Sequence, residues 1–176
     1  MIPAENTQPI SVMAAYIKEG YKRVEHLTGV KFGEDYLWHI QHPEESDWFP
    51  NSEKAAIALC VFKDYHRDDT ILFASDLQYA LYYEGRDLTD DEAYRHLLEQ
   101  YQIPAEAFYA KLKDPVYLEK ALYEFALCKQ LQVTGFPAVL LQVGESKFYL
   151  LSSGYTDYET LTQRLTNILK EQDAQP

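Results

Sequence analysis

The sequence has 176 residues, which is enough for one domain or for one domain with an insertion. Hydrophobic residues make up 47% of it and aromatic residues 14%, so the composition is that of a globular protein rather than of a disordered chain. The formal charge of −12 argues against nucleic acid as a partner, because a phosphate backbone requires a basic surface. We therefore expect an acidic, folded protein that binds no nucleic acid.

Two cysteines, Cys60 and Cys128, lie in apolar helical stretches and do not form a C-x-x-C pair. Free cysteine is among the most buried residue types, so we expect two structural thiols in a reducing compartment, the cytoplasm. No stretch reaches the roughly 18–20 apolar residues of a membrane span. The first six residues also lack the basic region and apolar core of a signal peptide.

Apolar residues at helical spacing fill most of the chain before residue 132. The predicted helices cover about 9–27, 34–40, 52–65, 71–83, 90–101, 104–112 and 115–131. Residues 89–92 and 156–159 both read T-x-x-E, the pattern of a capping box, which predicts Thr89 and Thr156 as helix N-caps. Either Asn51 or Ser52 is suited to cap the helix that follows Pro50.

Beyond residue 132 the pattern changes to that of a β-hairpin followed by a closing helix. Residues 138–143 predict a strand, residues 144–146 a turn and residues 147–152 the partner strand. The first strand is apolar on both faces, as in a strand covered on both sides, yet the chain supplies a single partner for it. Either the hairpin rests on the helices, or it borrows strands from another copy, or part of its sheet is missing.

Several segments carry a resemblance to a known family. Thr134-Gly135-Phe136-Pro137-Ala138, with the hairpin and helix after it, resembles the C-terminal half of a thioredoxin fold, in which this proline is cis. Residues 83–90, which read YEGRDLTD, are similar to a segment of the FrnE-like predicted protein-disulfide isomerases within the DsbA-like branch. Residues 28–33 and 51–56 are similar to the same branch, so the resemblance covers residues 1–170.

This resemblance implies a helix-dominated α/β fold. Residues 1–131 are then a DsbA-like helical insertion domain, whose first helix can pack on the thioredoxin part. Residues 132–172 are a partial thioredoxin-like hairpin with its helix, and residues 173–176 are a frayed tail.

The sequence departs from the family at its beginning, where the relatives have a strand, a C-x-x-C active site on a helix and a second strand. Met1 falls near a methionine that follows this part in the family, so we expect a chain that starts late. The implied function is that of a thiol-disulfide oxidoreductase or isomerase homologue, acting on protein or small-molecule thiols. Because the C-x-x-C segment is missing from the 176 residues, we expect this chain to be redox-inactive.

The site residues that carry over are Gly135, Phe136 and Pro137, where the backbone before the proline would bind an extended substrate strand. An ordinary fold-stabilising turn is the structural alternative for these residues. No catalytic residue and no cofactor is predicted. No metal site is predicted either, because His39-x-x-His42 has no further ligands nearby.

Two other functions stay open. One is a non-catalytic binding module, which could dimerise through the open sheet edge. The other is a relative of the kappa-type glutathione transferases and hydroxychromene-carboxylate isomerases, which share the helical insertion. The charged turn at residues 84–91 reads as a solvated cap network, with a catalytic acid pair as its alternative, and His26, His66 and His96 read as surface residues.

Overall fold

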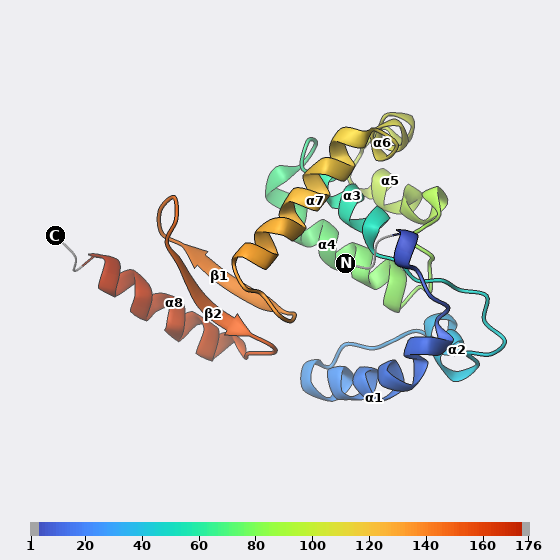
Figure 1. Cartoon of the computed structure of the whole chain (residues 1–176), viewed down its shortest axis with the longest axis horizontal. Coiled ribbons are helices and arrows are strands. Elements are labelled where there is room, and N and C mark those ends of the chain that lie inside the picture. The colour runs from blue at the N-terminus through green and yellow to red at the C-terminus, as the bar shows by residue number, and fades with distance from the viewer. Residues whose placement is uncertain (1–3, 174–176) are drawn as a thin grey trace. The chain divides into compact units, whose positions relative to one another are not determined.

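The computed structural model describes residues 4–173, and helices dominate this part of the chain (Figure 1). The α-helices are α1 (Ser11–Thr28), α2 (Glu34–Gln41), α3 (Glu53–Phe62), α4 (Thr70–Tyr82), α5 (Arg95–Gln100), α6 (Ala105–Leu112), α7 (Pro115–Gln130) and α8 (Tyr158–Asp173). Short 3₁₀ helices are η1 (Ala4–Asn6), η2 (Arg67–Asp69) and η3 (Asp91–Tyr94), and the strands are β1 (Ala138–Gln142) and β2 (Phe148–Ser153). Among the described helices, none combines the length and apolar character that crossing a membrane requires.

The chain divides into two compact units, which we call the helical unit (up to Glu124) and the hairpin unit (from Phe125). The division falls inside α7, whereas the sequence placed it after that helix. Tyr117 and Ala121, in the first half of α7, are buried, but no residue in its second half is. The predicted domain ranges stay predictions, and residues 174–176 of the predicted tail lie outside the described part.

Aromatic packing forms the core of the helical unit. The rings of Phe62 on α3 and Phe73 on α4 are fully buried and stack with their centroids 4.0 Å apart, and Tyr101 meets the Phe62 ring edge-on. Tyr94 is also fully buried, and its hydroxyl donates to the Leu88 carbonyl at 2.7 Å. Such large buried rings supply most of the apolar area that stabilises a unit of this size.

A second apolar cluster joins α1 to α2 through Ile10, Tyr36 and Ile40. Gly33 precedes α2 at a very close approach between two backbone segments, where its N–H donates to the Tyr82 carbonyl at 2.9 Å. A Cβ atom on Gly33 would lie 1.7 Å from the Tyr83 carbonyl oxygen. Only glycine fits at this contact, which fixes the start of α2 beside the end of α4.

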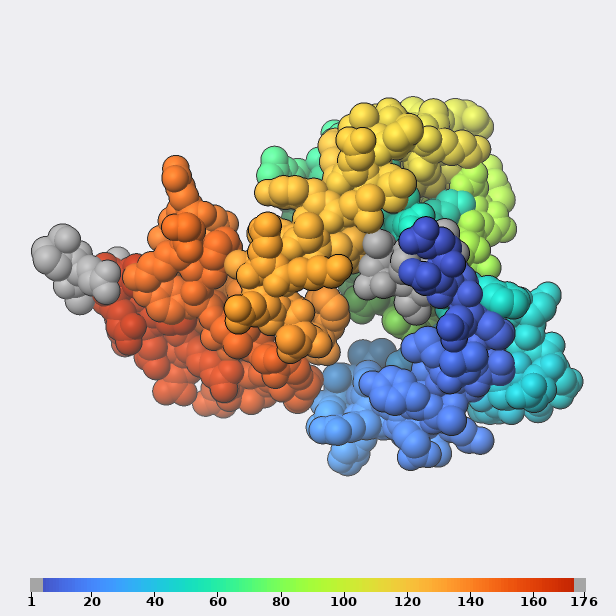
Figure 2. Space-filling model, viewed as in Figure 1, coloured from blue at the N-terminus to red at the C-terminus, as the bar shows by residue number. Residues whose placement is uncertain are grey.

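The hairpin unit contains a two-stranded antiparallel sheet with α8 packed against β2 (Figure 1). β1 ends one residue before its predicted end, and β2 begins and ends one residue later than predicted. The loop between the strands projects from the surface of this unit (Figure 2). None of the five residues of β1 is fully buried, although its apolar sequence is typical of a covered strand. Within residues 4–173, β1 therefore has one partner strand and an open edge, as the sequence indicated.

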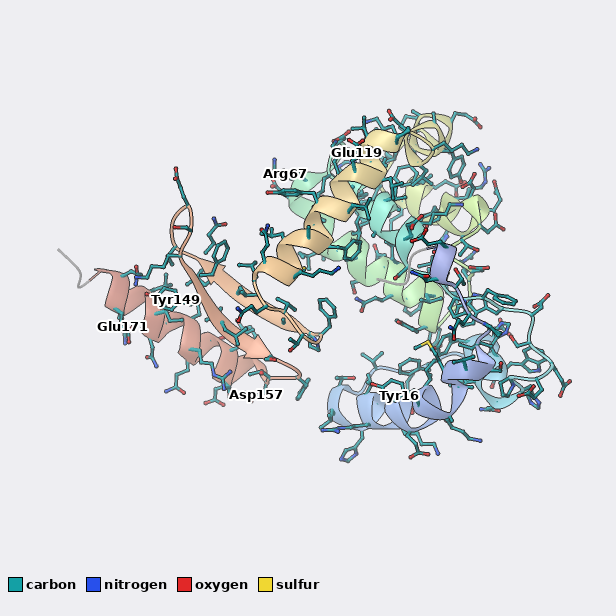
Figure 3. All side chains as sticks on the ribbon, in the orientation of Figure 1. Tyr16, Arg67, Glu119, Tyr149, Asp157 and Glu171 are labelled. Atoms are coloured by element: carbon teal, nitrogen blue, oxygen red, sulfur yellow. The ribbon has the colours of Figure 1, made fainter. Side chains whose placement is uncertain are left out.

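Two helix caps, Thr89 and Thr156, were predicted wrongly from the sequence, whereas Asn51 does accept from the Glu53 N–H at the start of α3. Thr89 is not a cap: Asp90 accepts from the Glu92 N–H instead, and it opens η3 rather than an α-helix. At α8 the capping oxygen belongs to Asp157, which accepts from the Thr160 N–H at 2.8 Å and lies at the start of the helix (Figure 3). In both places a carboxylate one residue along displaces the threonine, because a charged acceptor makes the stronger bond to a helix N-terminus.

We expect Gly33→Ala to lower the free energy of unfolding by roughly 1–3 kcal/mol, because the added methyl group overlaps the Tyr83 carbonyl oxygen and the backbone must shift. Chemical denaturation followed by circular dichroism measures the change.

Gly20→Ala is the matched control, because Gly20 lies inside α1 and the added methyl group would meet no atom within 4 Å apart from its chain neighbours and the local helix backbone. That variant should gain about 0.5–1 kcal/mol from the higher helix propensity of alanine. Equal effects of the two substitutions would contradict the close approach at Gly33.

Candidate functional site

The predicted substrate loop, residues 135–137, lies between the end of α7 and the start of β1. Gln132 adopts a left-handed conformation with φ of 57°, and the Val133 N–H donates to the Cys128 carbonyl, which together end the helix. The Phe136–Pro137 peptide bond is cis. All three loop residues are exposed, and the side chain of Phe136 is 73% exposed.

One hydrogen bond anchors this loop to the hairpin. The Gly154 N–H donates to the Pro137 carbonyl at 2.8 Å, directly beyond the last ladder pair, Ala138 and Ser153. Within the described residues the backbone N–H and C=O of Phe136 make no hydrogen bond. The loop thus has a fixed base and an unpaired backbone at its tip.

Neither of the two cysteines belongs to this loop. Cys60 is 2% exposed in α3, and burial raises the pKa of its thiol, which disfavours the nucleophilic thiolate. Cys128 lies in the other unit and is half-buried rather than buried as predicted. Both thiols are free. In the part of the chain that the structure describes, no group of histidine, cysteine and carboxylate side chains is arranged to hold a metal ion.

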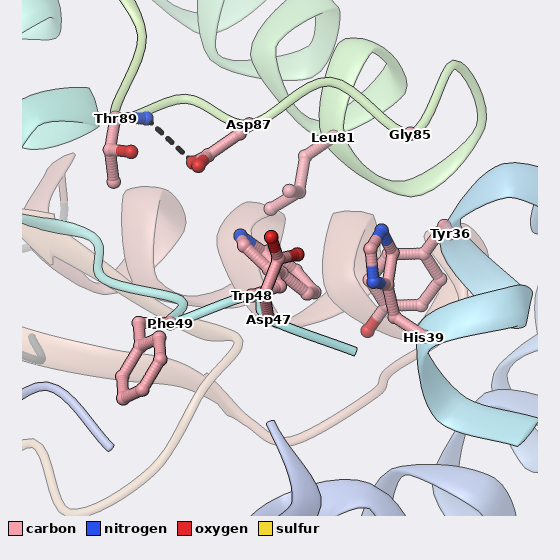
Figure 4. Close-up of a pocket in the computed structure, with 9 residues that line it drawn as sticks. All are labelled: Tyr36, His39, Asp47, Trp48, Phe49, Leu81, Gly85, Asp87 and Thr89. Atoms are coloured by element: carbon pink, nitrogen blue, oxygen red, sulfur yellow. Dashed lines mark hydrogen bonds between the residues drawn. The ribbon is translucent and has the colours of Figure 1, made fainter. Parts of the chain in front are cut away.

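A pocket of about 340 Å³ opens in the helical unit (Figure 4). Its lining comes from α2, from the 47–49 segment before α3, and from α4 with the turn that follows it: Tyr36, His39, Asp47, Trp48, Phe49, Leu81, Gly85, Asp87 and Thr89. Gly85 permits the turn, because its φ is 69° and a Cβ atom there would lie 2.6 Å from Asp35 Cβ. Sequence reasoning missed this pocket, because its three segments are far apart in the chain.

The charged turn at residues 84–91 is a network of caps and ion pairs. Glu84 accepts from Arg86 Nε at 2.5 Å and faces His96 Nε2 at 3.2 Å, while Asp87 accepts from the Thr89 N–H. Asp91 pairs with Lys54 at 2.6 Å, and this hydrogen bond lowers the pKa of the Asp91 carboxyl. Each of these carboxylates has a structural partner, which is the cap network that the sequence indicated.

Two of the histidines predicted to lie at the surface are half-buried. His66 Nε2 lies 3.0 Å from the Tyr101 carbonyl oxygen, and His96 Nδ1 is buried without a partner among the described residues. Aromatic packing around Phe62 and the turn at Glu84 draw these rings inward. His26, in the last turn of α1, is exposed as predicted. His39 bonds through Nδ1 to Ser46 Oγ at 2.7 Å.

Asp64 is the centre of a network that the sequence did not reveal. The Tyr117 hydroxyl donates a short hydrogen bond to Asp64 Oδ2, and Lys111 Nζ lies 3.0 Å from the same oxygen. Lys120 Nζ lies 3.5 Å from Asp64 Oδ1. The carboxylate thereby ties the turn after α3 to α6 and α7, and the Tyr117 hydrogen bond lowers its pKa below the ordinary 3.8.

Solved structures share this fold. One is a proposed protein disulfide isomerase from Nitrosomonas europaea, with 22% identity and a TM-score of 0.79, matched over 89% of this chain and 74% of that one. Another is the cytosolic disulfide reductase DsbM from Pseudomonas aeruginosa, with 22% identity and a TM-score of 0.69, matched over 95% of this chain and 80% of that one. No family model and no curated protein matches the sequence.

These likenesses show the fold that the sequence predicted, a helix-dominated DsbA-like thioredoxin fold with a helical insertion and a small antiparallel sheet. At 22% identity they establish the architecture and leave the activity to be argued from the site.

We expect the Asp64 network to make the helical unit sensitive to acid. A carboxyl group with a lowered pKa in the folded state stabilises the protein above its unfolded pKa, and the contribution is lost as the pH falls through the folded value. Asp64→Asn should therefore reduce stability at pH 7 and have progressively less effect below about pH 4. Urea denaturation of both proteins between pH 7 and pH 2.5 measures this.

Asp68→Asn provides the control, because Asp68 is an exposed carboxylate for which the described structure shows no ion pair. If both variants follow the same pH profile, the Asp64 network does not contribute to acid sensitivity.

Proposed function

We propose that this chain is a homologue of the DsbA-like thiol-disulfide oxidoreductases and isomerases, with Gly135, Phe136 and Pro137 contacting the substrate. The observation that carries the proposal is the shared architecture, with a TM-score of 0.79 over 89% of the chain to a proposed disulfide isomerase. The two neighbours described above are both named for disulfide chemistry.

The loop geometry supports the assignment of the substrate site. The exposed Phe136 offers an unpaired N–H and C=O at the end of a strand, which suits the addition of an extended segment by backbone hydrogen bonds. Its exposed ring adds an apolar surface for a neighbouring side chain of the substrate. The anchor from Gly154 to Pro137 holds this backbone in place before binding.

We propose that the 176 residues do not carry out thiol–disulfide exchange by themselves. Thiol–disulfide exchange begins when a thiolate attacks a disulfide sulfur, forms a mixed disulfide and releases the second sulfur as a thiolate. Cys60 is sealed in the core with a raised pKa, and the 176 residues contain no C-x-x-C pair. We therefore propose that this polypeptide binds cysteine-containing chains without reducing or oxidising them.

The substrates of this class are proteins or small molecules with thiol or disulfide groups. We propose a cytoplasmic location, supported by the two free cysteines and by the similarity to DsbM, a cytosolic disulfide reductase. The alternative of a non-catalytic binding module is favoured by the sealed Cys60, and the experiments below separate the two.

The first test is an insulin-reduction assay of the 176-residue polypeptide with dithiothreitol as reductant. We expect a rate equal to the background, because Cys60 is buried and the 176 residues contain no C-x-x-C pair. A Cys60→Ser, Cys128→Ser variant should give the same rate. A wild-type rate well above that of this variant would show that one of the two thiols is catalytic.

The second test measures binding of carbamidomethylated insulin B chain, an extended peptide with blocked thiols, by two-dimensional NMR. We expect the largest shifts at the amides of Gly135 and Phe136, and about tenfold weaker binding for Phe136→Ala, which corresponds to about 1.4 kcal/mol.

Tyr158→Ala is the matched control, because Tyr158 is 83% exposed in the same unit but lies on α8. Equal losses for both variants, or shifts confined to other regions, would remove residues 135–137 from the site and leave a binding module of another kind.

A further inference from the structure

The pocket in the helical unit has no role in the proposed disulfide chemistry, yet its size is that of a ligand site. Its volume of about 340 Å³ falls within the range of about 300–1,000 Å³ that is usual for small-molecule sites. All of its lining residues belong to the helical unit. Figure 4 shows side chains from α2, the 47–49 segment and the turn after α4 converging on it.

Aromatic rings form much of the pocket wall. Tyr36 is buried, and its ring meets the Trp48 ring edge-on with the centroids 5.9 Å apart, while Phe49 is half-exposed. Fixed rings of this kind present their electron-rich faces at little entropic cost. Such faces attract cations, most strongly at tryptophan.

Two carboxylates line the same pocket without a cationic partner. Neither Asp47 nor Asp87 makes an ion pair with any residue between 4 and 173, and Asp87 is held in place by the Thr89 N–H at 2.9 Å. The neighbouring cations are already engaged, since Lys54 pairs with Asp91 and Arg86 with Glu84. The pocket itself is lined by no lysine or arginine, so its walls carry uncompensated negative charge.

Trp48 supplies a third feature. Its indole Nε1–H is buried and finds no acceptor among the residues that the structure describes. Buried donors are normally satisfied, and one that is left over calls for an explanation. A ligand that carries an oxygen atom near its cationic group would provide this acceptor.

We propose that this pocket binds a small organic cation, an ammonium compound with a hydroxyl or carbonyl oxygen close to its charge. Aromatic faces and carboxylates together favour an alkylated ammonium group, because the rings replace its weakly held hydration while the carboxylates balance its charge. A bare divalent metal ion fits less well, because it needs several converging oxygen or nitrogen ligands and gains nothing from apolar walls.

Choline provides the probe, with 3,3-dimethylbutan-1-ol as its uncharged analogue of the same shape. The protein has two tryptophans, so Trp38→Phe leaves Trp48 as the sole tryptophan, which is excited selectively at wavelengths that tyrosine does not absorb. We expect choline chloride to change the Trp48 emission saturably against matched sodium chloride, with a dissociation constant of about 1 mM or tighter. The alcohol should bind at least about tenfold more weakly, because it lacks the charge.

Substitutions locate the site. In the Trp38→Phe background, Asp87→Asn and Asp47→Asn should each weaken choline binding about five- to tenfold, and asparagine at position 87 keeps the oxygen that accepts from Thr89. Asp68→Asn removes one charge outside the pocket and should leave the affinity unchanged. Unaltered circular dichroism and melting temperature confirm that each variant is folded.

Three results would overturn the proposal: equal binding of choline and the alcohol, equal effects of the three aspartate variants, or no saturable binding of choline. Tetramethylammonium, which lacks the oxygen atom, tests the role of Trp48. It should bind more weakly than choline and shift the Trp48 Nε1–H resonance less. An equal shift would show that the ligand oxygen does not accept a hydrogen bond from Trp48.

Discussion

The position of the candidate substrate loop depends on one hydrogen bond, from the Gly154 N–H to the Pro137 carbonyl. This bond continues the β1–β2 ladder by one step and so fixes Pro137 to the end of β2. Gly154 reaches it with a φ of 83°, a conformation that other residues rarely adopt. Because the carbonyl on one side of Phe136 is held, the free backbone of Phe136 stands at a defined place at the sheet edge rather than on a mobile segment.

Much of this architecture could be predicted from the sequence, because the spacing of apolar residues and the positions of proline and glycine indicate where helices lie and end. Pro115 starts α7 and Gly29 follows α1 with a left-handed φ of 75°, as helix-end chemistry requires. The caps were misjudged by one residue, since a threonine and the aspartate beside it compete for the same amides. The burial of β1 was overestimated from its sequence. An apolar strand is suited to burial on both faces, but its sequence does not say which elements pack against it.

The candidate sites differ in how far the sequence reveals them. Residues 135–137 are contiguous and belong to a recognisable motif, so their place before β1 could be predicted. The pocket around Trp48 and the Asp64 network each join segments that are distant in the chain. The close approaches at Gly33 and Gly85 set α2 beside α4 and the turn after it, and a lone glycine in a sequence gives no sign of its neighbour.

An irregularity in the hairpin determines how α8 is attached. Val139 pairs with Ser152 and Leu140 with Leu150, so Leu151 is an extra residue in β2. Its carbonyl accepts from Arg164 Nη1 at 2.7 Å, which joins the closing helix to main chain rather than to a particular side chain. This contact therefore does not depend on the identity of the Leu151 side chain, whereas adding or deleting one residue in β2 would turn the accepting carbonyl toward the opposite edge of the strand.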